Sequence, residues 1–339
     1  MDIEFHYWVT AFLAKNAGFS EDETEIIAYS SQYVDDNDVN FEIKDRSTGK
    51  VYRNYISQTM NILKPKLELM RIYPIFHFIP GEPDAITARR RDGKMHILNT
   101  TPDSEVANEI IDAAFKVSHD IRLYRIGIAS HSYVDTWAHQ NFVGWYDYFN
   151  NIGLDIKPDI GHADAEHHPD WINHIWIDNR LVESDVNNRH RFLSAARSLF
   201  FKYCEYIKIE KGDDNFSKWK NIESDLIYIW GATFTGSKNI NESTRIKGYK
   251  NKLNWLSDFD EKKWFDEAIK TKVHGMEDSQ NGILSKFTIF KDENYWKEGV
   301  NKHDTHWYRF QQAIKEHEKL ALSLLSSTFS KMGINLETA

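Results

Sequence analysis

The chain has 339 residues, of which 41% are hydrophobic and 14% aromatic, so it can bury a large core and is not intrinsically disordered. Its mean hydropathy is -0.59, and no apolar run approaches the ~20 residues of a bilayer-spanning helix, which excludes an integral membrane protein. The formal charge of -9 disfavours nucleic acid as a partner, although bound divalent cations would weaken that argument.

Cysteine content and the first residues bear on the cellular compartment. The single cysteine, Cys204, cannot form an internal disulfide. The sequence begins Met1-Asp2-Ile3-Glu4, which is acidic where a secretory signal would be basic and then apolar. We therefore expect a cytoplasmic protein.

Helical patterns dominate the first third of the chain. Residues 5–17 carry apolar groups at helical spacing and end at Gly18, and Ser20 with Glu23 forms a capping box that opens a second helix through about Val34. Two stretches with alternating polarity around turn residues predict small β-hairpins, and four stretches predict further helices. The hairpins are expected over 40–53 and 86–99, and the helices over 104–117, 119–141, 188–210 and 304–331.

Two other stretches have a different character. Residues 142–178 are rich in Gly, Pro, Asp, His and Trp with little periodicity, which is typical of a functional loop. Residues 211–300 begin with a polar, Asn- and Lys-rich stretch, which we interpret as an insertion or lid. The sequence therefore predicts one all-α domain over residues 1–339, a multi-helix bundle with small inserted β-hairpins.

The clearest chemical signal is a run of donors in the 119–141 helix. His131, Asp135 and His139 recur every four residues, so their side chains share one stripe of the helix. The axial rise from His131 to His139 is about 12 Å, too long for one ion with ligand bonds of about 2 Å. Asp135 could instead bridge two ions spaced by about 3.5–4 Å. Gly127, one turn earlier, leaves space for another element. The alternative is a helix whose polar groups face solvent or pair with one another.

Carboxylates and a histidine occur at two further places. Asp35 and Asp36 end the second helix, where the helix dipole disfavours them by roughly 0.3–1 kcal/mol each unless a positive charge compensates. A solvated polar helix end is the alternative. His77 lies within the apolar run 75–80, where a buried imidazole needs a partner, and a metal ion is one such partner.

The remaining candidate donors are His6, His162 and Glu166. His6 has aromatic neighbours and on its own fits a satisfied core histidine. His162 and Glu166 are four residues apart, as on one face of a helix, with more donors adjacent. Five separated segments that supply imidazole or carboxylate are typical of a metal cage built from several helices.

Several short segments also carry a resemblance to a known family. They are Phe5-His6-Tyr7, Gln32-Tyr33-Val34-Asp35-Asp36, Phe76-His77-Phe78, Asp135-Thr136-Trp137-Ala138-His139-Gln140, Gly161-His162 with Pro169-Asp170, and the late His-Trp helix. Over nearly its whole length the chain resembles an uncharacterised bacterial domain-of-unknown-function family. That resemblance names no reaction.

A more distant resemblance is to zinc-dependent phospholipase C and the fungal zinc nucleases. It implies an all-helical phosphodiesterase fold that holds two or three divalent ions, zinc first, with Mn or Fe as alternatives. In those enzymes an N-terminal tryptophan amine also binds zinc, and this sequence begins with Met1. The metal-binding roles would fall to His6, Asp35 or Asp36, His77, His131, Asp135, His139, His162 and Glu166.

The leading hypothesis is a metal-dependent hydrolase of small-molecule or lipid phosphoesters, in which Asp35 or Asp36 orients or deprotonates a water. One alternative is an HD-type phosphohydrolase, because His119 and Asp120 are adjacent and follow His77. A second alternative is a helical interaction module with a structural metal, since the eleven tryptophans could line a protein interface.

Overall fold

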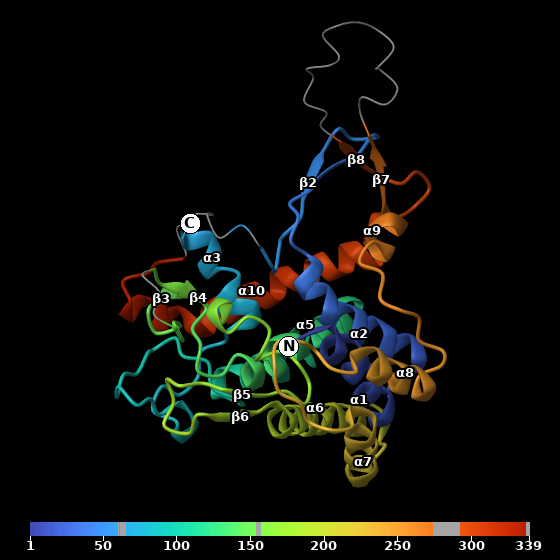
Figure 1. Cartoon of the computed structure of the whole chain (residues 1–339). Helices are drawn as coiled ribbons and strands as arrows, with labels where there is room; N and C mark the ends of the chain where they lie inside the picture. The colour runs from blue at the N-terminus through green and yellow to red at the C-terminus, as the bar shows by residue number, and fades with distance from the viewer. Residues whose placement is uncertain (60, 62–65, 154–156, 274–291, 337–339) are drawn as a thin grey trace, which may run out of the picture.

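The computed structural model describes residues 1–59, 61, 66–153, 157–273 and 292–336. It shows a mostly helical body from which one small sheet projects (Figure 1). Within the described ranges, no helix is long and apolar enough to cross a membrane. The largest buried cluster of apolar side chains lies among the helices of this body.

A helical hairpin forms the N-terminal part of the body, as predicted. Gly18, with a φ of 115°, ends its first arm. Ser20 and Glu23 form the predicted capping box of the second arm. The first arm differs from the prediction in one respect, because it begins as a π-helix. The bounds are η1 (Glu4–Val9), α1 (Thr10–Ala17) and α2 (Glu21–Asp36).

Helix α5 is the central element of the body. It packs against α2, α4, α6 and α10, and its side chains from Tyr124 to Ala138 are all buried. Gly127 lets α2 approach closely, since a Cβ at that position would lie 2.4 Å from the Ile27 carbonyl oxygen. The four helices predicted over 104–117, 119–141, 188–210 and 304–331 are confirmed. They are α4 (Glu105–Ala114), α5 (His119–Ala138), α6 (Asn188–Lys211) and α10 (His306–Lys331).

The projecting sheet joins two distant parts of the chain. The predicted hairpin over 40–53 forms from β1 (Glu42–Lys44) and β2 (Val51–Arg53), which pair antiparallel. β1 also pairs in parallel with β8 (Glu293–Trp296), which pairs antiparallel with β7 (Ile269–Lys272). The strand order is β2-β1-β8-β7 (Figure 1).

Residues 211–300, interpreted from sequence as an insertion or lid, contact the N-terminal segment. Arg245 of α8 forms a buried, bidentate ion pair with Glu4 of η1. Residues 274–291 of this region lie outside the described residues. Its helices are η5 (Phe216–Lys218), α7 (Trp219–Trp230), α8 (Glu242–Lys252) and α9 (Lys263–Ala268), and η8 (Lys302–Asp304) follows β8.

The prediction of a β-hairpin over 86–99 was wrong. The expected turn does form, since the Gly93 N–H donates to the Arg90 carbonyl. The flanking residues do not pair with each other. Arg90 and Asn99 instead make single antiparallel bridges to Leu181 and Val143. This stretch contains only the short η3 (Ile86–Ala88), because its backbone groups pair with the long loop that follows α5.

That long loop is irregular, as the sequence predicted for residues 142–178. Its regular pieces are two- or three-residue strands and one 3₁₀ turn: β3 (Tyr146–Asp147), β4 (Asp159–Ile160), η4 (Ala163–Ala165), β5 (Ile175–Ile177) and β6 (Asp185–Asn187). Before α4 lie α3 (Lys66–Met70) and a second π-helix, η2 (Tyr73–His77). Because π-helical turns recur at functional sites, it is notable that η1 contains His6 and η2 ends at His77.

Candidate metal centre

Four side chains from three helices form a first group of donor atoms. His131 and Asp135 come from α5, His77 ends η2, and Asp35 lies near the end of α2. His131 Nε2 lies 3.1 Å from His77 Nδ1, 3.2 Å from Asp135 Oδ2 and 3.7 Å from Asp35 Oδ1. His77 Nδ1 lies 3.5 Å from Asp135 Oδ2 and 3.7 Å from Asp35 Oδ1. Ligands at about 2.0 Å around a tetrahedral zinc are about 3.3 Å apart, so His77, His131 and Asp135 fit one ion, and Asp35 lies slightly farther from both rings.

Backbone hydrogen bonds orient both imidazoles of this group. His131 donates from Nδ1 to the Ser31 carbonyl at 2.8 Å, and His77 donates from Nε2 to the Ser57 carbonyl at 2.9 Å. In the neutral rings the other nitrogens therefore carry lone pairs, and these nitrogens face each other. Two lone pairs and two carboxylates at such separations repel unless a cation or a proton lies among them.

A second group contains three donors at the end of α5 and in the following loop. His139 is the C-cap residue of α5, and its Nε2 lies 3.4 Å from Asp170 Oδ1. His162 Nε2 lies 3.5 Å from Asp170 Oδ2. His139 donates from Nδ1 to the His77 carbonyl at 2.7 Å, and His162 donates from Nδ1 to the Glu166 carbonyl at 2.8 Å. The pattern of the first group is thus repeated, because each ring turns a lone pair toward a carboxylate.

Asp135 connects the two groups. Its Oδ2 faces His131 and also lies 3.5 Å from His139 Nδ1. Its Oδ1 lies 3.2 Å from His6 Nε2 and 2.5 Å from the amino nitrogen of Met1, which is 3.4 Å from Asp170 Oδ1. His6 is fully buried and stacks on His131 with ring centroids 3.8 Å apart, and neither of its nitrogens has a hydrogen-bond partner among the described residues.

The charges of the site favour a bound cation. Burial alone would lower the pKa of His131, but the carboxylates of Asp135 and Asp35 raise it above its usual value. Burial opposes ionisation of Asp135, yet its pKa is held well below the usual range by His139, the Met1 amine and His131. Burial and the neighbouring His131 lower the pKa of His6 to about 3. The surroundings of His131 and Asp135 thus stabilise positive charge, and a metal ion bound to ionised carboxylates and neutral imidazoles would supply it.

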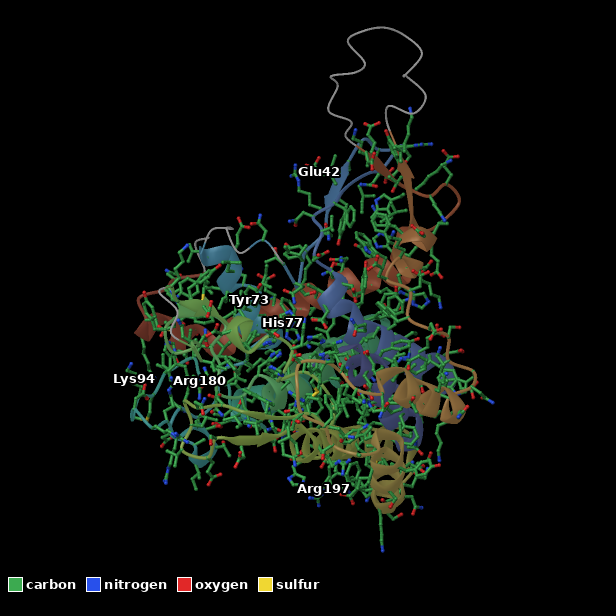
Figure 2. All side chains as sticks on the ribbon, in the orientation of Figure 1. Glu42, Tyr73, His77, Lys94, Arg180 and Arg197 are labelled. Carbon is green, nitrogen blue, oxygen red and sulfur yellow. The ribbon has the colours of Figure 1, made fainter. Side chains whose placement is uncertain are left out.

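Both groups border a pocket of about 780 Å³. Tyr73 and His77 lie side by side near the centre of the body (Figure 2), and Phe78 contributes an apolar wall that stacks on His139. The pocket is lined by Met1, Asp2, Asp35, Gln58, Tyr73, His77, Phe78, Asp135, His139, Ile160, His162, Ala163, Glu166, His167 and Asp170. A substrate in this pocket would therefore contact donor residues of both groups.

Most of the residues predicted from sequence converge here. The structure brings together His6, Asp35, His77, His131, Asp135, His139 and His162. Asp36 is directed elsewhere, since its Oδ2 accepts a hydrogen bond from Gln32 and it belongs to none of the donor groups found among the described residues. Burial raises the pKa of Asp36 to about 6.

The helical spacing expected for His162 and Glu166 was wrong. Residues Ala163–Ala165 form a 3₁₀ turn, and Glu166 has a φ of 50°. The Glu166 side chain is exposed at the pocket, and only its backbone carbonyl contacts His162. A short turn with a positive φ cannot place two side chains on one stripe, so the carboxylate of the second group comes from Asp170 instead.

Asp170 was not among the predicted ligands. A signal for it was present, because Asp170 closes the histidine-rich stretch and belongs to the Pro169-Asp170 segment of the resemblance. His119 and Asp120, on which the HD-type alternative depends, are exposed in the first turn of α5. They lie outside every donor group found among the described residues.

Comparisons with known proteins identify the family but not an activity. The chain belongs to the family of unknown function DUF6765, whose model matches residues 1–325. This confirms the resemblance to a domain-of-unknown-function family. No curated protein and no solved structure matches the chain, so the likeness to zinc phospholipase C has no support from these comparisons.

Proposed function

We propose that this protein is a metal-dependent hydrolase of phosphodiesters that holds two divalent ions, zinc first among them. The observation that carries the proposal is the set of four imidazoles, each oriented by a backbone carbonyl, that direct lone pairs at three carboxylates beside an open pocket. When bound, such ions neutralise a phosphoryl group and lower the pKa of water towards neutrality.

The two donor groups both reach the pocket. In the first group, His77, His131 and Asp135 lie at ligand separations, and Asp35 Oδ1 lies 3.7 Å from both rings. Asp35, His77 and Asp135 line the pocket, as do all three donors of the second group, His139, His162 and Asp170. Three protein donors with an open position are typical of a catalytic site. We therefore assign substrate contact to both groups.

Asp35 is the residue that we assign to proton transfer. Its side chain is 27% exposed and lines the pocket, whereas the Asp135 side chain is 1% exposed. Asp35 Oδ1 faces the rings of His77 and His131, which leaves its other oxygen to accept a proton from the attacking water. Asp36, the other sequence candidate, is not part of the pocket lining.

The charges of the pocket indicate the kind of phosphoester. Its lining contains no lysine or arginine among the described residues, so no basic side chain there would bind a phosphate. Two divalent ions and the Met1 ammonium would carry five positive charges, against three negative charges on Asp35, Asp135 and Asp170. The net positive charge attracts an anionic phosphoester, and the exposed Glu166 carboxylate repels a dianionic monoester more than a phosphodiester monoanion.

The test is elemental analysis of protein purified without chelator, together with hydrolysis assays on phosphodiesters and phosphomonoesters. We expect about two transition ions per chain, loss of hydrolysis with EDTA, and recovery on adding Zn, Mn or Fe. The variant His131→Ala should lose metal and activity. The matched control His119→Ala, on the exposed end of the same helix, should retain both.

Three outcomes would contradict the proposal. Fewer than one transition ion per chain would exclude a metal centre. Loss of metal in His119→Ala, with retention in His131→Ala, would favour HD-type chemistry. Tightly bound metal that inorganic phosphate does not contact, with no hydrolysis of any ester, would favour the interaction module with a structural metal.

A further inference from the structure

A buried arginine on α6 holds the end of the helix that carries most of the donors. Arg191 donates from Nε to the Trp137 carbonyl at 2.8 Å, and its Nη2 contacts the Trp137 and Ala138 carbonyls. These carbonyls belong to the last turn of α5, where no backbone N–H remains to pair with them. They immediately precede His139, so the guanidinium determines where the C-cap residue of α5 lies.

The neighbouring asparagine holds the turn that carries Asp170. Asn188, in the first turn of α6, donates from Nδ2 to the His168 and Trp171 carbonyls, each at 2.8 Å. These two residues flank Asp170 in the chain. Asn188 is fully buried, and its two hydrogen bonds fix the backbone on either side of Asp170 to α6.

The two residues are themselves connected. Arg191 Nη1 donates to Asn188 Oδ1 at 3.1 Å, and the same oxygen accepts from Trp176 Nε1 at 3.2 Å. One continuous network on one helix thus reaches the backbone beside His139 and the backbone beside Asp170. Neither Arg191 nor Asn188 lines the pocket or belongs to a donor group.

The charge of Arg191 also suits its position. A cation is favoured at a helix C-terminus by the helix dipole. Burial lowers the pKa of Arg191 to about 9, while Asp170 and Asp178 oppose that decrease, so the guanidinium is still charged at neutral pH. Its charge in turn favours the ionised form of Asp170.

We propose that Arg191 and Asn188 are positioning residues for the second metal site, and that they set the separation of His139 and Asp170 without touching the ion. This inference rests on the proposed function, because it presupposes that the second donor group binds metal. Outer residues that orient metal ligands typically affect metal affinity by 10–100-fold when they are replaced. Among the described residues, neither Arg191 nor Asn188 forms a hydrogen bond or ion pair with a side chain of the first donor group, so the affinity of that group should not change.

The experiment compares Arg191→Gln and Arg191→Lys with Arg197→Gln in the full chain. Arg197 lies on the exposed side of the same helix (Figure 2), which makes it a matched control. Metal-free protein is titrated with Co²⁺ and with Zn²⁺, and the number of ions and both affinities are measured. The urea unfolding of each metal-free variant is measured in parallel. Lysine retains the charge but cannot reach both carbonyls as a guanidinium does.

We expect Arg191→Gln to bind the second ion at least 10-fold more weakly, with the first affinity unchanged, and Arg197→Gln to behave as wild type. Arg191→Lys should lie between them. Unchanged affinities in both Arg191 variants would overturn the inference and leave the proposed function standing. An equal loss at both sites, together with a lower urea midpoint, would make Arg191 a general structural residue and also overturn it. Absence of metal from the wild type would overturn the proposed function first.

Discussion

The two donor groups of the site differ in how the chain builds them. The first is made by regular elements, with His131 and Asp135 on α5, Asp35 on α2 and His77 at the end of η2. The second is made where regular structure stops, at the C-cap of α5 and in the irregular loop beyond it. Helices thus supply the first group, a loop supplies most of the second, and both groups reach the pocket.

This difference shows which interactions hold each donor group in place. The helices of the first group are fixed by close packing, of which Gly127 is the clearest example. The loop of the second group depends on particular hydrogen bonds from α6. Packing therefore fixes the first group, and a few hydrogen bonds fix the second.

The largest expected effect comes from Asp135, the buried carboxylate of the first group that also lies 3.5 Å from His139 Nδ1. Asp135→Asn removes the charge that faces His131 on one side and His6 on the other. We expect the first ion to be lost, so that the metal content falls from two ions to about one, with hydrolysis abolished. Elemental analysis checks this. Asp120→Asn, in the exposed first turn of the same helix, should retain both ions, and two ions bound to Asp135→Asn would refute Asp135 as a ligand.

An intermediate effect should separate the two groups. In Gly127→Ala the new Cβ would meet the Ile27 carbonyl at 2.4 Å and force α2 away from α5, which should cost about 1–3 kcal/mol of unfolding free energy and weaken the first ion. In Gly161→Ala the Cβ would meet the Phe78 ring at 2.4 Å, and the φ of 59° adds strain, so the second ion should weaken.

Metal titration and urea unfolding measure both variants. Gly212→Ala is the control, because Gly212 has a φ of 78° with no atom within 4 Å of the new Cβ. It should lose some stability and no metal affinity. If Gly127→Ala and Gly161→Ala weakened the same ion, the division into two groups would be wrong.

The smallest effect is expected at Glu166. Its exposed carboxylate lines the pocket without joining a donor group, so Glu166→Gln should keep both ions. Removal of a negative charge near an anionic substrate should raise kcat/KM by no more than about fivefold, the size of a solvent-exposed charge interaction. Steady-state kinetics and metal analysis check this. Loss of one ion would restore Glu166 to the role of ligand that its spacing suggested.

Sequence reasoning succeeded where chain geometry is periodic. A period of four residues places His131, Asp135 and His139 on one stripe, and a glycine one turn earlier indicates a close neighbour. Near the end of α2, the sequence alone did not distinguish Asp35 from Asp36 as the ligand. Adjacent side chains point about 100° apart around a helix, and no local pattern shows which of the two faces α5. In the loop, no period exists, so Asp170 could not be preferred over Glu166.

Prediction of the fold was also limited to features that have a local sequence pattern. The helices α4, α5, α6 and α10 were predicted within a few residues, because each has its own apolar stripe. Pairing between distant segments has no local signal, as in the parallel contact of β1 with β8. The stretch 86–99 shows the converse, since a local turn formed there while the expected strands paired with other segments.

The hydrogen bond from His139 to the His77 carbonyl has a consequence for how the centre fills. The ring of His77 serves one group, and its backbone orients a ligand of the other. An ion that immobilises His77 would also restrict the imidazole of His139 through this hydrogen bond. The second ion would then lose less conformational entropy when it orders His139. Loading should therefore be cooperative, with a Hill coefficient above one, and protein with a single ion should be less populated than it would be for two independent sites.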